Sequence, residues 1–174
     1  MDAQSPFEAL PAGPVRRLFE SISQHDLGGM VACFAEDYVN ETPIHPDRSF
    51  TGREQVRKNW STILAGLRDL QPYVVRATTA PDGMVWVEWG QRGTRPDGVP
   101  VALAGVSIFT LDADAIAAVR FYLEPVERES GDVNANVHSI VGQIPATAAA
   151  GSASAASDAG ASNASGDPAG GGRP

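Results

Sequence analysis

One carboxylate in this chain has neighbours that suit it to acid–base catalysis. Glu88 stands between Trp86 and Trp89, and indole rings that exclude water would destabilise its charged form and raise its pKa. A carboxyl group with a raised pKa can exchange a proton near neutral pH. The alternative is an ordinary ion pair with Arg92 or Arg120, or a position facing solvent at a dimer edge. We take Glu88 as the first candidate acid or base.

The other polar candidates come from an extended segment and a proline-rich loop. His45 lies in that loop, where its near-neutral pKa suits a base, although the sequence defines no partner for it and a solvated loop residue is the alternative. Asn40 and Thr42 alternate along the extended segment and are candidates to bind a ligand oxygen, or one another. Ser107 has the same two interpretations, since buried polar groups are usually satisfied within the protein.

Three helices are predicted ahead of the strands, from apolar residues at helical spacing. The first contains Val15, Leu18, Phe19 and Ile22; the second begins at an Asp26 N-cap; and the third begins at a capping box of Thr51 and Glu54. Trp60 lies on the apolar stripe of the third helix, either as the roof of a pocket or as part of the core.

The second half of the chain is predicted to be mostly strand, because β-branched and aromatic runs alternate with turn residues. A short extended segment, Glu36 to Pro43, precedes the third helix. The four long strands are Tyr73 to Thr79, Met84 to Thr94, Val99 to Leu111 and Ile116 to Val126. Helices followed by such a meander indicate an α+β fold, with the helices on one face of an antiparallel sheet.

Strand alternation then assigns side chains to the two faces of the sheet. In the last strand Val119, Phe121 and Leu123 should face inward. In the Met84 to Thr94 strand, counting from the Asp97-Gly98 turn places Trp86, Glu88, Gly90 and Arg92 inward. Counting from Gly83 leaves the opposite parity open, and a slip of one residue would invert the assignment.

Composition divides the chain into four segments. Residues 1–13 are expected to be a flexible lead-in, 14–128 the folded domain, and 129–142 a short C-terminal helix. Residues 143–174 consist almost entirely of Ala, Gly, Ser, Asp and Pro, and such a segment has too little apolar area to offset the entropy of ordering. It is predicted to be a disordered tail.

Charge and composition also limit the partners. The formal net charge is −8, and the 13 Lys and Arg residues are scattered, so no basic surface is expected to bind nucleic acid. There is no run of about 18 apolar residues to cross a membrane. A single cysteine, Cys33, and three dispersed histidines offer no metal-binding spacing. The chain is expected to be cytoplasmic and to need no metal or other cofactor.

Several segments resemble the NTF2-like superfamily, in particular its SnoaL-like proteins. The matching segments are Asp26 to Asp37, Pro43, Thr51-Gly52-Arg53-Glu54 and Arg120-Phe121-Tyr122. The resemblance implies a cone-shaped sheet whose mouth is closed by helices, with a pocket inside and homodimers formed through the convex face. It implies no one activity, because this fold hosts isomerases, hydrolases, cyclases and plain binding modules.

Two catalytic residue sets of the superfamily are not matched. Ketosteroid isomerases use a carboxylate base, and a tyrosine and a neutral carboxylic acid that donate hydrogen bonds to the enolate oxygen. These three positions fall on Thr42, Leu18 and Ser107, none of which has the required group. The set of the limonene epoxide hydrolases falls approximately on Glu88, Gly90, Phe121, Asn40 and Thr42, and only Glu88 of these is ionisable.

The sequence therefore predicts a protein that binds a small, largely apolar molecule, with cofactor-independent isomerase, hydrolase or cyclase chemistry as one possibility. The alternative is a non-catalytic binding or dimerisation module. The predicted catalytic residues are Glu88 and His45. The predicted ligand-binding residues are Asn40, Thr42, Trp60, Trp86, Arg92, Ser107, Phe121 and Leu123.

Overall fold

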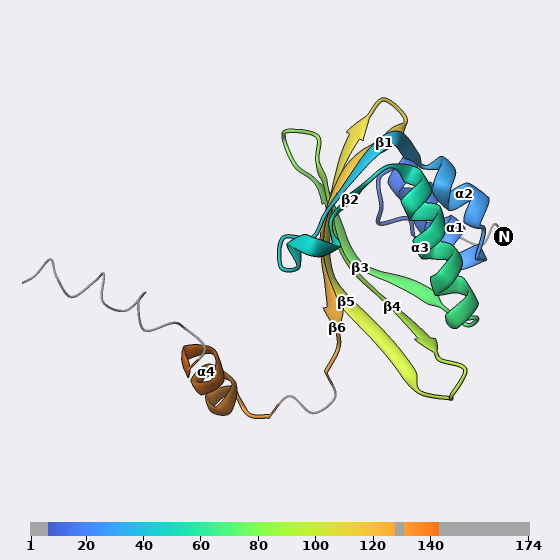
Figure 1. The fold of residues 1–174 in the computed structure, drawn as a ribbon. Helices are drawn as coiled ribbons and strands as arrows, with labels where there is room; N and C mark the ends of the chain where they lie inside the picture. Colours follow the sequence, from blue (N-terminus) through green and yellow to red (C-terminus); the bar gives the residue numbers. More distant parts are fainter. Residues whose placement is uncertain (1–6, 128–130, 143–174) are drawn as a thin grey trace, which may run out of the picture. The chain divides into compact units, whose positions relative to one another are not determined.

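Three helices lie over one face of a single curved sheet in the computed structural model, which describes residues 7–127 and 131–142 (Figure 1). The chain divides into two units, 1–127 and 128–174, and the first contains the entire sheet. The predicted α+β class, with three helices ahead of a strongly curved sheet, is confirmed.

The first two helices form where the apolar spacing predicts them. Helix α1 (Pro14–Gln24) has proline in its first turn and buries its apolar stripe, and His25 ends it in the left-handed conformation. Helix α2 (Leu27–Ala32) is capped by Asp26, whose carboxylate accepts a hydrogen bond from the backbone N–H of Gly29 at 3.0 Å. The predicted N-cap is confirmed.

The third helix begins differently from the prediction. Helix α3 (Arg53–Gly66) has Gly52 as its N-cap, at φ 93°, and no side chain caps it. The capping box of Thr51 and Glu54 is wrong because Thr51 belongs to strand β2 (Phe50–Thr51), where it pairs with Val39. Glycine accommodates the positive φ that turns the chain from strand into helix.

The sheet has six strands in the order β2-β1-β6-β5-β4-β3. The four long strands match their predicted ranges to within two residues: β3 (Gln71–Thr79), β4 (Val85–Thr94), β5 (Pro100–Asp112) and β6 (Ala115–Pro125). Strand β1 (Phe34–Glu41) runs parallel to β6, whereas the other neighbouring strands are antiparallel. A 3-10 turn, Pro46–Arg48, connects β1 to β2.

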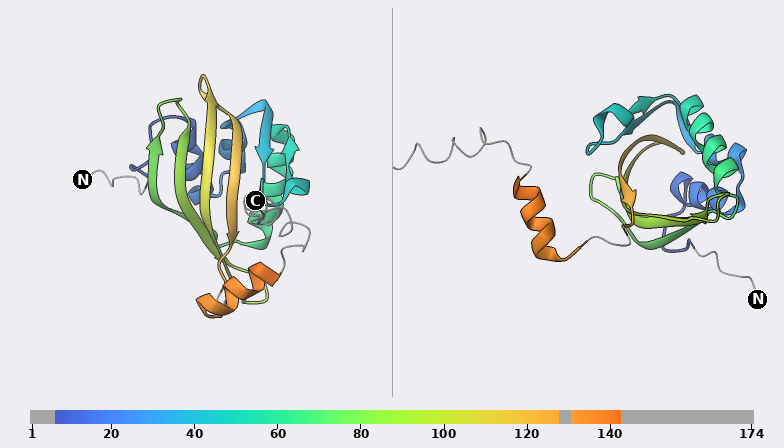
Figure 2. Two further views of the ribbon diagram at one scale, coloured as in Figure 1. Left: turned by 90° about the vertical axis from the view of Figure 1, so that its left-hand side faces the viewer. Right: turned by 60° about the horizontal axis from the view of Figure 1, so that its bottom comes forward.

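The sheet is curled, as the right-hand view of Figure 2 shows, and a glycine in the middle of β5 permits close approach to β6. Gly105 has φ 155°, and a Cβ atom there would overlap the carbonyl oxygen of Tyr122 on β6. Interior glycines of this kind mark tight bends and close approach between backbones. The curl makes one face concave, and the helices lie over that face.

The segment ahead of α1 packs into the core, contrary to the prediction of a flexible lead-in over residues 1–13. Phe7 and Leu10 are 3% and 1% exposed, and the Phe7 ring lies 5.9 Å from that of Phe19. Residues 1–6 and the predicted tail, 143–174, lie outside the described residues. Helix α4 (Val133–Gly142) falls within the predicted 129–142 segment. Among the described residues, no helix has the length and apolar character to span a membrane.

The bend at Gly105 generates a stability prediction. Gly105→Ala should lower the free energy of unfolding by about 1–3 kcal/mol, because the new methyl group must displace the backbone of β6. Urea unfolding measures the change. Gly66→Ala is the matched control, since nothing lies within 4 Å of its added Cβ; equal effects at the two sites would contradict the assigned role of Gly105.

Candidate functional site

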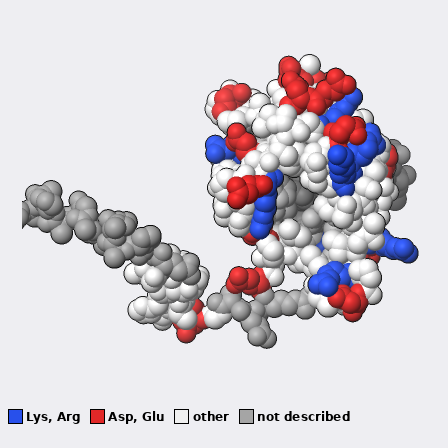
Figure 3. All heavy atoms as spheres, viewed as in Figure 1, with Lys and Arg blue, Asp and Glu red and all other residues white. Residues whose placement is uncertain are grey.

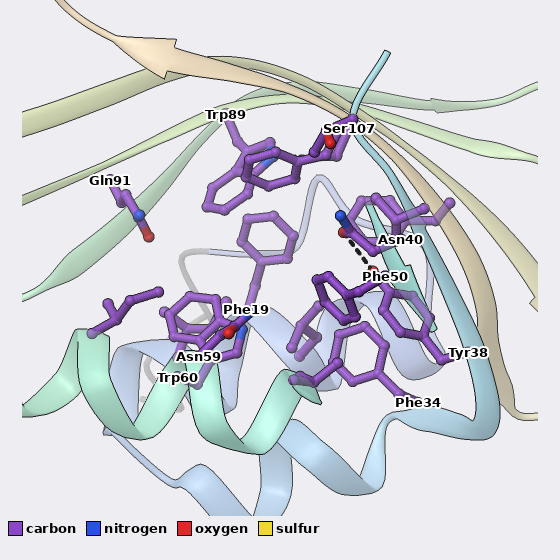
Figure 4. Close-up of a pocket in the computed structure, with 18 of the residues that line it drawn as sticks. Phe19, Phe34, Tyr38, Asn40, Phe50, Asn59, Trp60, Trp89, Gln91 and Ser107 are labelled. Atoms are coloured by element: carbon purple, nitrogen blue, oxygen red, sulfur yellow. Dashed lines mark hydrogen bonds between the residues drawn. The ribbon is translucent and has the colours of Figure 1, made fainter. Parts of the chain in front are cut away.

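A cavity of about 250 Å³ lies between the concave face of the sheet and helices α1 and α3 (Figure 4). Its size is near the lower end of small-molecule pockets, roughly 300–1,000 Å³. Most of its wall is aromatic or aliphatic. The aromatic residues are Phe19, Phe34, Tyr38, Phe50, Trp60, Trp89, Phe109 and Phe121; the aliphatic residues are Leu18, Ile22, Val56, Ile63 and Val119; the polar residues are Asn40, Thr42, Arg48, Asn59, Gln91 and Ser107.

Tyr38 and Asn40 form a buried polar pair on β1. The Tyr38 hydroxyl donates to the Oδ1 atom of Asn40 at 3.0 Å, the bond drawn dashed in Figure 4. Burial raises the pKa of the Tyr38 phenol well above its ordinary value. The phenol therefore stays protonated and donates a hydrogen bond, which makes it a poor base.

Trp89 and Ser107 form a second pair, on β4 and β5. The Trp89 indole N–H donates to the Ser107 hydroxyl at 3.0 Å, and Ser107 is fully buried. The same indole meets the Phe19 ring of α1 edge-on, with centroids 4.9 Å apart. The hydrogen bond thus orients an aromatic wall that contacts both the helix layer and the cavity.

Gln91 is the exception among the polar groups of the wall. Its side chain lies on β4, and the residue is 6% exposed. Figure 4 shows its carboxamide pointing toward the cavity. Its Oε1 atom has no hydrogen-bond partner among the described residues, although a buried polar atom left unpaired costs about 1–3 kcal/mol.

The turn between β1 and β2 brings Thr42 and Arg48 to the cavity. The Thr42 hydroxyl donates to the His45 carbonyl oxygen at 2.7 Å, and the Thr42 N–H donates to the Ser49 hydroxyl at 3.0 Å. These bonds hold the turn that contains Arg48. Among the described residues, Arg48 is the one charged side chain that lines the cavity.

Five of the ten residues predicted as catalytic or ligand-binding line the cavity. They are Asn40, Thr42, Trp60, Ser107 and Phe121. The inward parity predicted for the last strand agrees with the structure, since Val119 and Phe121 line the cavity and Leu123 is 4% exposed. Leu123 lies in the core away from the cavity wall.

Three of the other predicted residues lie on β4 and face away from the cavity, because that strand has the opposite parity to the count from the Asp97-Gly98 turn. Trp86 is 41% exposed. The Glu88 carboxylate pairs with Arg76 on β3 and is 39% exposed, so the two indoles do not enclose it. Arg92 lies over the Tyr73 ring, 4.8 Å from its centroid.

His45 also does not line the cavity. Its Nε2 atom lies 3.0 Å from the Glu124 carboxylate of β6, so the partner that the sequence did not define is an acid on a neighbouring strand. This contact connects the β1–β2 turn to β6. His45 thus contributes to the site by holding the turn in place.

Trp89 and Gln91 were missed by the sequence analysis, as were Arg48 and Asn59. A signal for the first two was available: Val85, Val87 and Trp89 alternate as apolar residues, and such a run favours the buried face of a strand. Nothing in the sequence identified Arg48 or Asn59, because both depend on how the turn and α3 approach the sheet.

The described residues contain no group of three or more His, Cys, Asp or Glu side chains placed to hold a metal ion. On the face shown in Figure 3, acidic and basic side chains are interspersed, without the broad basic surface that binds phosphate backbones.

The family profile of the SnoaL-like domain matches residues 15–119, well over half of the chain. This chain belongs to the SnoaL-like domain family. The match begins at the start of α1 and ends within β6, so it includes all residues of the cavity wall except Phe121. A search of curated protein sequences finds no match.

Solved structures of low identity share the fold. A ketosteroid isomerase-like protein from Catenulispora acidiphila, in complex with trimethylamine, is 17% identical, with a TM-score of 0.56 over 65% of this chain and 87% of that one. A Mycobacterium tuberculosis protein in complex with estradiol-17beta-hemisuccinate is 20% identical, with a TM-score of 0.55 over 67% and 92%. SalBIII, an epoxide hydrolase/cyclase-like enzyme of salinomycin pyran ring formation, is 21% identical, with a TM-score of 0.56 over 65% and 88%.

The unpaired amide of Gln91 leads to a prediction about stability. Gln91→Leu should raise the free energy of unfolding by about 1 kcal/mol, because it replaces an unsatisfied buried polar group with hydrocarbon of similar size. Thermal or urea unfolding measures the gain. Gln71→Leu, at an exposed position of β3, is the control; a loss of stability confined to Gln91→Leu would show that the amide has a stabilising partner.

The buried phenol of Tyr38 leads to a prediction about pH. Near neutral pH, Tyr38→Phe should cost about 1 kcal/mol, because it leaves the Asn40 Oδ1 atom unpaired. Above the unfolded-state pKa of 10.0 the phenol ionises in the unfolded chain and stays protonated in the native one, so the wild type loses stability as pH rises. The variant lacks this loss, and urea unfolding at neutral and alkaline pH should show the gap narrowing; a constant gap contradicts the raised pKa.

Proposed function

We propose that this chain binds a small, ring-bearing and largely apolar molecule in the cavity under α1 and α3. The observation that supports it is a cavity of about 250 Å³ whose wall is mostly aromatic or aliphatic and whose few polar groups come from different elements of the fold. Concave, mostly apolar pockets with a small number of placed polar groups are typical of small-molecule sites. Asn40, Thr42, Trp60, Ser107 and Phe121 are the proposed ligand contacts among the residues selected from sequence.

Of the two predicted alternatives, the arrangement favours binding without acid–base catalysis. The ionisable residues among those lining the cavity are Tyr38 and Arg48. The first stays protonated, and an arginine is effectively always charged, so neither suits a general base. Glu88 and His45 pair with Arg76 and Glu124 away from the wall. The structural relatives solved with trimethylamine and with estradiol-17beta-hemisuccinate support a binding role for this fold.

Two further predictions concern assembly and location. Homodimers through the convex face, and a cytoplasmic location, both stay predictions.

The proposal is tested with N-phenyl-1-naphthylamine, a neutral aromatic probe whose fluorescence rises in apolar surroundings. Titration of the full chain should give a saturable signal with one site per chain. Trp60→Ala should weaken binding about tenfold or more, because it removes a large aromatic surface from the wall. Glu88→Gln is the control and should bind as the wild type does, since Glu88 faces away from the cavity.

Two results would contradict the proposal. One is the absence of saturable probe binding to the folded wild-type chain. The other is equal weakening by Trp60→Ala and Glu88→Gln, which would locate the probe outside the cavity.

A further inference from the structure

The pocket contains one buried polar group that the protein leaves unsatisfied. Gln91 is more than nine-tenths buried, its Oε1 atom has no partner among the described residues, and its carboxamide points toward the cavity. By contrast, Trp89 and Tyr38 on the same wall both donate to neighbouring side chains. An open, buried acceptor that points toward the cavity matches a ligand that carries a hydrogen-bond donor.

The pocket also has one charge without a counter-charge. Six other arginines of the described residues form ion pairs with acids. No ion pair or side-chain hydrogen bond within the described part of the chain involves the Arg48 guanidinium. The chain has 21 acidic and 13 basic residues, so acids are abundant, yet none of those described neutralises this cation. A guanidinium presents a planar fork of donors that matches a carboxylate.

Asn40 adds a second donor near Arg48. Its Oδ1 atom already accepts from Tyr38, so its NH₂ group is the part left for a ligand. Asn40 pairs with Phe50 of β2 in the sheet, and Arg48 lies just ahead of Phe50. The Arg48 guanidinium and the Asn40 NH₂ group are therefore two donors of the cavity wall on the same hairpin, as an anionic group requires.

The two ends of the pocket come from opposite sides of the sheet. Gln91 is on β4, and the Arg48 turn precedes β2; the strands β5, β6 and β1 lie between them. Figure 4 shows the Gln91 and Asn40 side chains on opposite sides of the cavity, with aromatic rings between them. The curl of the sheet (Figure 2) turns these sides toward one another across the aromatic wall.

We infer that the ligand of the proposed site is an elongated, ring-bearing hydroxy acid. Its carboxylate binds the Arg48 guanidinium and the Asn40 amide at the β1–β2 end, and its hydroxyl donates to Gln91 at the β4 end. The rings between them contact the aromatic wall. Arg48 is exposed, so the carboxylate stays in contact with water and its desolvation costs little. This inference rests on the proposed function and adds the chemical class of the ligand.

The test uses three probes that displace N-phenyl-1-naphthylamine from the full chain. They are 4′-hydroxybiphenyl-4-carboxylate, the corresponding carboxamide, which lacks the charge, and biphenyl-4-carboxylate, which lacks the hydroxyl. In the wild type the hydroxy acid should bind about fivefold more tightly than the carboxamide, as expected for an exposed ion pair. It should bind about tenfold more tightly than the acid without the hydroxyl.

Each preference should disappear in one variant only. Arg48→Gln should abolish the preference for the acid over the carboxamide and keep the preference for the hydroxyl. Gln91→Leu should do the reverse, and its raised stability excludes misfolding as the cause. Arg68→Gln is the matched charge control, because Arg68 is exposed, has no ion pair among the described residues and does not line the cavity; it should keep both preferences.

The outcomes separate this inference from the proposed function. Suppose that N-phenyl-1-naphthylamine binds and Trp60→Ala weakens its binding, but the wild type shows neither preference. The proposed binding function is then supported, and the inference that the ligand is a hydroxy acid is overturned. Equal effects of Arg48→Gln and Arg68→Gln would also overturn the ionic contact. Failure of the wild type to bind N-phenyl-1-naphthylamine removes the pocket proposal, and the inference with it.

Discussion

The packing of α1 on the concave face of the sheet is the interaction on which the site depends. Phe19 is fully buried and meets the Trp89 ring edge-on at 4.9 Å, and Phe7 packs behind it. Such aromatic contacts add directional preference to a large buried area. They occupy one part of the hollow that the curled sheet creates, and the part between β1, β4 and α3 remains open as the cavity.

Some polar groups of the cavity wall pair with one another, and others have no partner among the described residues. Tyr38 with Asn40, and Trp89 with Ser107, satisfy one another at 3.0 Å, and such closed pairs rigidify a buried wall. Gln91 and Arg48 do not follow this rule. Functional sites are where natural proteins most often keep locally unfavourable groups. The contrast between these paired atoms and the open groups, which include the Asn40 NH₂, is therefore the strongest indication of where a ligand makes polar contacts.

Sequence reasoning recovered the fold because its evidence was periodic and local. The helical stripe of α1, the Asp26 cap and the four long strands each depend on residues near one another in the chain. The capping box failed because Thr51 pairs with Val39, a tertiary contact that overrides local propensity. Phe7 and Leu10 were assigned to a flexible segment because two apolar residues among prolines show no period, although their burial is nearly complete.

The site was harder to predict because it depends on parity and on approach between elements. Counting from the turn after β4 assigned the wrong face of that strand to the cavity. It therefore selected Trp86, Glu88 and Arg92 as inward residues and missed Trp89 and Gln91. The alternation of Val85, Val87 and Trp89 was the better guide, since apolar burial decides which face of a strand turns inward. Arg48 lies in a turn whose position is held by His45 and Glu124, a contact between residues 79 positions apart that no local pattern shows.

The positions that the resemblance assigns to the catalytic residues of the ketosteroid isomerases can be compared with the cavity wall. The three positions that correspond to their catalytic residues, Thr42, Leu18 and Ser107, all line the cavity. These three side chains lack the groups that the resemblance would require for isomerase chemistry: Leu18 is hydrocarbon, the Ser107 hydroxyl accepts from Trp89, and the Thr42 hydroxyl holds a turn. In a fold of this kind the curled sheet and the helices determine where a ligand lies. A few side chains on the wall determine whether it is transformed or only held.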